Sequence, residues 1–184
     1  LAWGMYRTGN NQTKIWRRTN TTYTEFEEVF SLPNDITFIE GSVGVSILDD
    51  TIMCCEYTTV LYEEGTNIFL PPLELNVWKG TNDGRDWEVV VTRNRNPQFE
   101  GDIDVIRHFH TVRYDAYENI FWIGSGDGGH QCAIYTINPD GTNFQIIFQG
   151  VRDIADGQMY RTTSFMFTDN FIWWGSDAQK EGYH

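Results

Sequence analysis

Apolar and polar residues alternate over short stretches along most of the chain, which is the period of β-strands that bury one face. Polar turns separate these stretches. The strongest turn signals are Asp83–Gly84 and Asp140–Gly141, because Asp-Gly favours tight β-hairpins. The pattern predicts an all-β chain of about thirteen strands. The alternating stretches, single or paired around a turn, are 1–7, 14–20, 25–32, 42–57, 76–91, 110–127, 133–148 and 161–177.

The paired stretches belong to two families that repeat along the chain. In the first family, HTVRYDAYENIFWIGS from His110 aligns without a gap with RTTSFMFTDNFIWWGS from Arg161, and a fainter copy lies at 42–57. The second family pairs 76–91 with 133–148. Because the families alternate, four antiparallel strands recur about every 50–60 residues, which is typical of β-propeller blades. A β-sandwich is the alternative, since short strands at regular spacing suit it too.

The alternation divides a single predicted domain, 1–184, into blades. It predicts a partial blade at 1–33, complete blades at 39–94 and 105–150, and a partial blade at 158–184. About three blades are too few for a closed propeller, which has typically about 4–8. We therefore expect a partial propeller within a larger protein, completed by other segments or chains. The recurring tryptophans, which we expect to pack in the core between blades, are Trp122, Trp173 and Trp174.

Composition narrows the class of function. Aromatic residues make up 15% of the chain, which favours strands. The formal net charge of −13 argues against a nucleic-acid partner, which proteins contact with clustered Lys and Arg. No apolar run approaches the roughly 20 residues that span a bilayer, so we expect no membrane insertion. The three cysteines show neither a disulfide framework nor a zinc-binding spacing.

One segment carries a family resemblance. GTNDGRDWEVV, which is 80–90, resembles the Asp-box of sialidase-like propellers with BNR repeats. Gly84 and Trp87 match that motif, whereas Asn82 stands where the motif has Asp. The stretch 108–177 also resembles an uncharacterised, glycosyl-hydrolase-like branch of the same superfamily. The resemblance implies a β-propeller and a carbohydrate ligand. The arginine triad and the Arg-Ile-Pro motif of true sialidases are not recognisable, so it does not imply hydrolysis of sialic acid.

In a propeller, the first strand of each blade lines the central axis, and the loop after the second strand opens on the face from which the first strand enters. This geometry places all four histidines on one face. His108 and His110 begin a first strand, while His130 and His184 lie in loops that follow second strands. The other polar candidates expected on that face are Arg107, Asp127, Tyr160, Arg161 and Asp177.

His108 and His110 point to the same side of their strand because successive side chains alternate. Together with Asp127 they would suit a divalent metal ion, since imidazole nitrogen and carboxylate oxygen are good ligands. A purely structural role is the alternative, in which the two histidines cap strand ends and bond to neighbouring carbonyl groups.

Two further roles fit the same face. Proton transfer beside an acidic sugar would use His108, His110, Tyr160 and Arg161 as the catalytic set, with Arg161 neutralising the acid. Direct hydrogen bonding to a sugar would need no reaction. The residues expected to bind such a ligand are Arg107, Asp127, His130 and Asp177.

These observations lead to a functional hypothesis. We expect a glycan-recognising or glycan-processing propeller module, displayed in an extracellular, cell-surface or virion protein. If it is an enzyme, a glycoside hydrolase or a polysaccharide lyase is expected. The alternative is a structural or protein-interaction propeller without catalytic activity. The identity of the sugar stays open at this stage.

Overall fold

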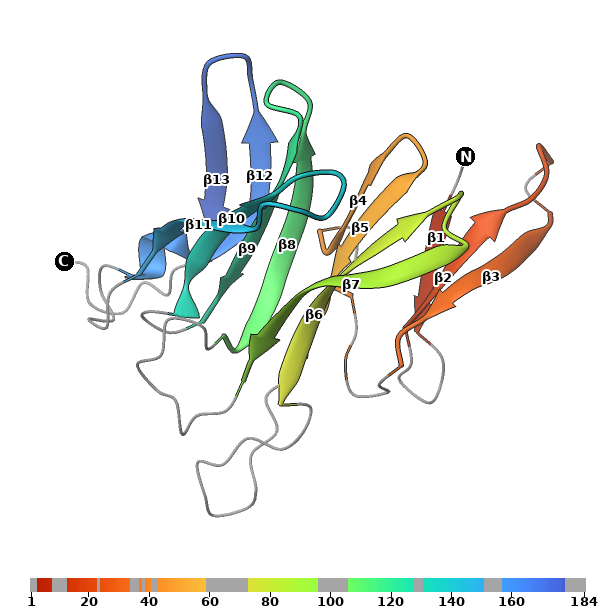
Figure 1. Cartoon of the computed structure of the whole chain (residues 1–184), viewed down its shortest axis with the longest axis horizontal. Helices are drawn as coiled ribbons and strands as arrows, with labels where there is room; N and C mark the ends of the chain where they lie inside the picture. Colours follow the sequence, from red (N-terminus) through yellow and green to blue (C-terminus); the bar gives the residue numbers. More distant parts are fainter. Residues whose placement is uncertain are drawn as a thin grey trace.

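Antiparallel strands make up most of the described part of the chain (Figure 1). This computed structural model describes residues 3–7 (backbone only), 13–22, 24–33, 37, 39–40, 43–58, 73–95, 106–127, 131–150 and 157–177. Within these ranges, no helix is long and apolar enough to cross a membrane. The elements are β1 (Trp3–Arg7), β2 (Thr13–Arg18), β3 (Phe26–Ser31), β4 (Val45–Leu48), β5 (Thr51–Cys55), β6 (Glu74–Thr81), β7 (Asp86–Asn94), β8 (His108–Asp115), β9 (Ile120–Gly126), β10 (Ala133–Ile137), β11 (Gln145–Gln149), the short 3-10 helix η3 (Gln158–Tyr160), β12 (Thr162–Phe167) and β13 (Ile172–Ser176).

The strands form four sheets in chain order, namely β1–β3, β4–β7, β8–β11 and the hairpin β12–β13. Neighbours in the described sheets are antiparallel and consecutive in sequence, so each sheet is a simple meander. The predicted Asp-Gly turns are confirmed. Asp83 and Gly84 have φ of 55° and 74°, and Gly141 has φ of 88°, the left-handed region that tight hairpin turns require. The prediction of an all-β fold is confirmed.

Successive sheets pack face to face. Because side chains alternate along a strand, the two sheets in the middle of the series, β4–β7 and β8–β11, bury side chains on both faces. Cys54 packs toward β1–β3, and its neighbour Cys55 packs toward β8–β11. Both thiols are free, as is that of Cys132. Representative side chains of the three inter-sheet clusters are Ile15, Leu32 and Trp78, then Met53, Val77, Phe109 and Tyr135, then Trp122, Ile134 and Phe165.

Strand β8 lies between the first strands of the two neighbouring sheets, β4 and β12 (Figure 1). Hydrogen bonds join it to the neighbouring sheet, because Val112 N–H donates to the carbonyl of Val43 at 2.9 Å and Tyr114 N–H donates to Ser46 Oγ at 2.9 Å. First strands that lie side by side are the arrangement expected around a propeller axis.

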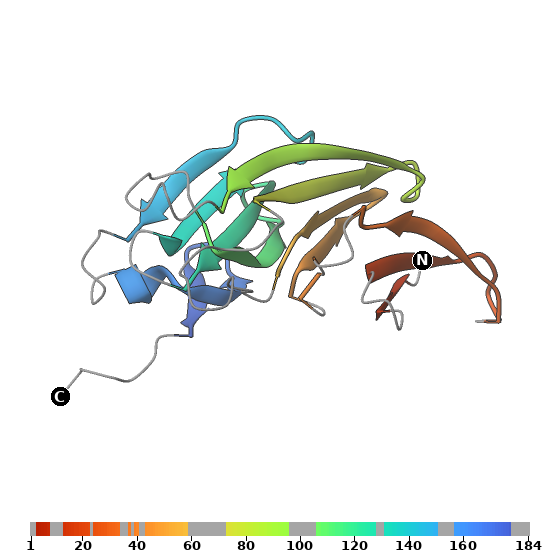
Figure 2. The same cartoon turned by 90° about the horizontal axis from the view of Figure 1, so that it is seen from below.

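The described sheets form an open series and not a closed ring. Figure 2 shows them following one another in chain order, with β1–β3 and β12–β13 at opposite ends. The observed sheets span 3–31, 45–94, 108–149 and 162–176. The propeller and its division into blades stay predictions.

One expectation about the core is wrong. Trp122 is 8% exposed and packs between sheets, as predicted, and Trp174 belongs to the same cluster. Trp173 is 56% exposed instead. It occupies the repeat position of Trp122, but none of the described sheets covers that face of β13.

Candidate functional site

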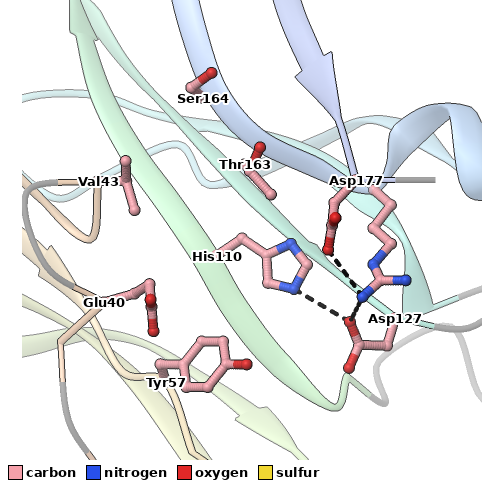
Figure 3. Close-up of a pocket in the computed structure, with 9 residues that line it drawn as sticks. Glu40, Val43, Tyr57, His110, Asp127, Thr163, Ser164 and Asp177 are labelled. Atoms are coloured by element: carbon pink, nitrogen blue, oxygen red, sulfur yellow. Dashed lines mark ion pairs between the residues drawn. The ribbon is translucent and has the colours of Figure 1, made fainter. Parts of the chain in front are cut away.

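The carboxylate of Asp127 lies where two sheets meet. Asp127 directly follows β9, Arg107 directly precedes β8, and Arg161 directly precedes β12. Arg107 Nη1 lies 2.9 Å from Asp127 Oδ2, and Arg161 Nη2 lies 2.8 Å from Asp127 Oδ1. The same Arg161 nitrogen lies 3.0 Å from Asp177 Oδ2, so one guanidinium bridges two carboxylates (Figure 3). The structure thus brings together four of the residues that the sequence predicted.

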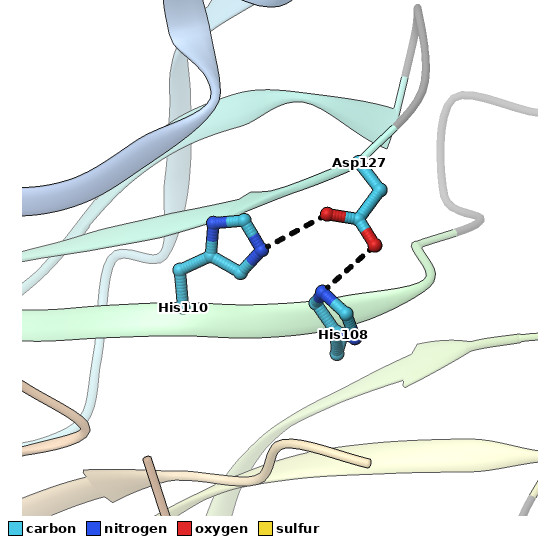
Figure 4. A group of neighbouring side chains, drawn as sticks. All are labelled: His108, His110 and Asp127. Atoms are coloured by element: carbon cyan, nitrogen blue, oxygen red, sulfur yellow. Dashed lines mark ion pairs between the residues drawn. The ribbon is translucent and has the colours of Figure 1, made fainter. Parts of the chain in front are cut away.

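Two histidines complete the surroundings of Asp127 (Figure 4). His108 Nε2 lies 3.1 Å from Oδ2, and His110 Nε2 lies 3.4 Å from Oδ1. Both side chains are on one side of β8, whereas Phe109 between them lies in the hydrophobic core. Strand alternation, as expected, separates the polar and apolar faces here. The ligand atoms of the three residues all lie within 4.8 Å of one another.

Gly126 makes room for this arrangement. A Cβ at this position would lie 3.0 Å from Arg161 Cγ and 3.3 Å from His110 Cε1. Because β8 and β9 are antiparallel, Gly126 lies opposite His108, at the end of the ladder where Asp127 begins the loop. A side chain here would push the arginine or the histidine away from the carboxylate.

The charges around Asp127 determine its protonation. Burial alone would raise the pKa of this carboxyl group, but contacts with His108 and His110 and the charge of Arg107 hold the pKa well below its usual range. Asp127 is therefore ionised near neutral pH. Its carboxylate contacts two guanidinium groups and two imidazole rings.

His108 is held on three sides. Its Nδ1 lies 3.1 Å from the carbonyl oxygen of Thr58, its Nε2 faces Asp127, and the ring of Tyr57 stacks on it with centroids 4.0 Å apart. Burial lowers the pKa of His108, although Asp127 acts in the opposite direction. Its contact with the Thr58 carbonyl agrees with the structural alternative that the sequence left open for this residue.

His110 differs from His108 in the surroundings of its Nδ1. The residue is buried, and within the described structure its Nδ1 has neither a hydrogen bond nor an ion-pair contact, whereas Nδ1 of His108 contacts the carbonyl oxygen of Thr58. Its Nε2 faces the carboxylate of Asp127 at 3.4 Å. Because the Nδ1 atom is itself buried, His110 contributes other atoms of its ring to the surface of the site.

A cavity of about 390 Å³ lies beside Asp127. Residues from three sheets surround it, with the β8–β11 sheet in the middle (Figure 3). Its lining combines carboxylates, hydroxyl groups, an imidazole and a guanidinium, with few apolar groups. The lining residues are Glu40, Val43, Tyr57, His110, Asp127, Arg161, Thr163, Ser164 and Asp177.

Sequence reasoning missed several of these lining residues. Glu40 lies before the fainter copy at 42–57, and Tyr57 is the last residue of that copy. Thr163 did carry a signal, because it stands where the preceding repeat has Val112. A hydroxyl group at a position that is apolar in the other copy indicates a change from packing to polar contact.

One predicted residue, Tyr160, lies away from the cavity, and two predicted histidines are not described. Tyr160 stacks on Phe148 with ring centroids 5.5 Å apart, and it is not among the residues that line the cavity. It belongs to the hydrophobic cluster between the last two sheets. His130 and His184 lie outside the described residues.

The predicted metal ligands do not fit a divalent cation as they stand. His108, His110 and Asp127 are close enough to share an ion. However, Arg107 and Arg161 already contact both carboxylate oxygens at 2.9 and 2.8 Å. Two positive charges this close repel a cation and neutralise the acid that would attract it. The metal ion stays a prediction that the charges disfavour.

Comparisons with known proteins give little further guidance. No protein-family model matches the chain, and no curated protein matches it. Among solved structures, a chain described as "Crystal structure of Nidogen/Laminin Complex" superposes with a TM-score of 0.36 and 13% identity. The match covers 94% of this chain and 68% of that one. A likeness this low carries no argument about fold or function, and the sialidase-like resemblance stays a prediction.

Proposed function

We propose that this chain binds a glycan in the cavity beside Asp127, as part of a β-propeller whose axial face carries that cavity. The position of the cavity supports this proposal. Val43 lies in the turn that precedes β4, His110 lies on β8, and Thr163 lies on β12, so part of the wall comes from the first strands of two successive sheets and from the segment before a third. Ligand sites of closed β-structures lie in such central openings.

The chemistry of the lining favours a polyhydroxylated ligand. A sugar hydroxyl both donates and accepts hydrogen bonds, so it pairs equally well with carboxylates and with arginine. Glu40, Asp127 and Asp177 offer acceptor oxygens, Arg161 offers donors, and Tyr57 offers a hydroxyl group. Such mixed lining suits a neutral sugar better than an acidic one, because three carboxylates oppose one guanidinium.

Recognition fits the site better than cleavage. Glycoside hydrolysis requires a carboxylic acid that protonates the leaving oxygen. Asp127 cannot be that acid, because its depressed pKa keeps it ionised. Its contacts with two arginines also weaken it as a nucleophile. Tyr160, which a lyase reaction would have used, packs on Phe148 instead. We therefore propose binding, with hydrolase or lyase activity as the less favoured alternative.

The observation that carries the proposal is the gathering of three carboxylates, one guanidinium and three hydroxyl groups around a single cavity. Ligand hydroxyl groups both donate and accept hydrogen bonds, so they can pair with every one of these groups. Arg161 contacts both Asp127 and Asp177, which fixes its position before a ligand arrives.

The test is a glycan array followed by calorimetry on the bound sugars. Tyr57→Phe and Thr163→Val should each weaken binding by about tenfold, which corresponds to the loss of one hydrogen bond. Thr92→Val is the matched control, because Thr92 lies exposed on the outer strand β7. The Thr92→Val variant should bind the glycan with the affinity of the wild type. If no glycan binds, or if the cavity variants bind as tightly as the control, the proposal is wrong.

A further inference from the structure

The last hairpin, β12–β13, exposes large apolar side chains. Met166, Phe171 and Trp173 are 61%, 64% and 56% exposed. Met166 pairs with Trp173 across the hairpin, and the rings of Phe171 and Trp173 lie 6.2 Å apart between centroids. These three residues form one continuous surface, here named the terminal apolar face. Apolar surface of this kind is unusual on a soluble chain unless something covers it.

The repeat shows what the equivalent face does one sheet earlier. Trp122, the counterpart of Trp173, packs on Phe165 and Phe167 of the following sheet at centroid distances of 6.1 and 6.4 Å. Gly124 and Gly175, two residues after Trp122 and Trp173, show the same difference between the two hairpins. A Cβ on Gly124 would lie 2.8 Å from the Thr162 carbonyl oxygen of the next sheet, whereas one on Gly175 meets atoms of its own hairpin. The terminal apolar face is thus built as an inter-sheet surface.

At the opposite end of the series, none of the described sheets packs on the outer side of β1–β3. In β1–β3, Ile15 and Leu32 pack toward the next sheet. Alternation along β2 turns Trp16 to the other side, and Phe26, on the neighbouring strand, is exposed. Lys14 shares this side of β2 and is tied to Glu28 by an ion pair of 2.6 Å, and Arg18 lies opposite Phe26. We name Lys14, Trp16, Arg18 and Phe26 the leading face.

Within the chain, the trailing face of each described sheet packs on the leading face of the next one. Only the terminal apolar face and the leading face of β1–β3 are left without such a partner among the described sheets. We propose that the terminal apolar face of one copy docks on the leading face of a second copy. This head-to-tail contact continues the series of sheets, and it is independent of glycan binding. Contacts of this type form rings or open assemblies.

Charge sets the conditions for the contact. Each copy carries a formal net charge of −13, so two copies repel each other at low ionic strength. Salt screens this repulsion, and at about 0.15 M the Debye length falls to about 8 Å. The apolar contact itself does not weaken with salt. Association should therefore strengthen as salt is added, which is opposite to an interface held by ion pairs.

Sedimentation equilibrium of the chain, over a range of concentrations and salt, tests the proposal. The wild-type chain should associate. Trp173→Glu and Phe26→Glu should each weaken association at least tenfold. Tyr117→Glu is the matched control, since Tyr117 is an exposed aromatic residue in the β8–β9 turn, and it should associate like the wild type. All three sites are exposed, so thermal unfolding should show that each variant folds.

A mixture of the two interface variants separates docking from non-specific aggregation. The Trp173→Glu copy keeps an intact leading face, and the Phe26→Glu copy keeps an intact terminal face. Mixed together, they should form one-to-one dimers and nothing larger. A wild-type chain that stays monomeric at every concentration and salt would overturn the proposal. So would a dimer that Trp173→Glu breaks and Phe26→Glu leaves intact, because that pattern indicates two terminal faces in contact.

Discussion

Asp127 joins two sheets through its side chain, and its carbonyl oxygen also accepts a hydrogen bond from Gln158 Nε2 at 2.9 Å. Arg107 and both histidines approach it from the start of β8, and Arg161 approaches from the segment that precedes β12. The side chain of Asp127 is only 10% exposed, and those of Arg107 and Arg161 are 34% and 14% exposed. Removing the charge of Asp127 would therefore leave two partly buried guanidinium groups without this counter-ion, which costs stability. Asp127 should therefore matter for stability as well as for ligand binding.

We predict that Asp127→Asn lowers the free energy of unfolding by about 3 kcal/mol near neutral pH. Asp177→Asn is the matched control. Asp177 contacts the same Arg161, but its side chain is 58% exposed, so the change should stay within about 0.5 kcal/mol. Urea unfolding of the three proteins measures both values.

The stability that Asp127 contributes should depend on pH. The pKa of Asp127 is depressed in the folded state, so its contribution to stability is present above the unfolded pKa of about 3.9 and is lost as pH falls toward the folded pKa. The difference between wild type and Asp127→Asn should therefore shrink in acid. A difference that stays constant down to acid unfolding would show that the charge of Asp127 is not what stabilises the fold.

Part of this site could be predicted from the sequence. His108, His110, Arg107, Asp127 and Arg161 follow from strand alternation and from the hairpin ends, which are regular features. Alternation says nothing about segments without a regular period. Glu40 lines the cavity from such a segment, Tyr57 lines it from the end of the faintest repeat copy, and tertiary packing brings both there. Tyr160 was misplaced for a related reason, since the 3-10 helix η3 breaks the strand register just before β12.

At the scale of the elements, the two glycines that end the repeated hairpins provide a comparison. Gly124 and Gly175 occupy the same repeat position in β9 and β13. We predict that Gly124→Ala destabilises the protein by about 2 kcal/mol, because the added Cβ would press on the Thr162 carbonyl at 2.8 Å.

Gly175→Ala should be close to neutral, and thermal unfolding measures both glycine variants. A Cβ at Gly175 would lie 3.3 Å from the Ser164 hydroxyl oxygen, and the atoms close to it are side-chain atoms of its own hairpin. Equal effects of the two substitutions would show that Gly124 is required by its own hairpin and not by the contact with β12.

The hairpins themselves were predictable, because Asp-Gly turns and two-residue periodicity are local properties of the sequence. The contacts between sheets were predictable only in part. Repetition predicted that Trp122 and Trp173 are both buried between sheets, but only Trp122 is buried. Whether a repeated residue is buried depends on the presence of the next sheet, which the residue's own neighbours in sequence do not encode.

At the scale of the whole molecule, the four sheets contact one another in series. Proteins of this kind are held together by interfaces between neighbours, so their stability varies along the series. The β8–β11 sheet has clusters on both faces, which are centred on Tyr135 and on Trp122. The β12–β13 hairpin has two strands and one covered face.

This asymmetry predicts a gradient of local opening. In dilute solution, where copies do not associate, amide hydrogen exchange should be slowest in β8, β9 and β10 and fastest in β12 and β13, because protection follows the free energy of local opening. Pulse labelling with mass spectrometry resolves these segments. Raising the concentration should then protect β12 and β13 first, since docking of a second copy covers Trp173. Uniform exchange across all four sheets would mean that they unfold as one cooperative unit, and the serial description of the molecule would fail.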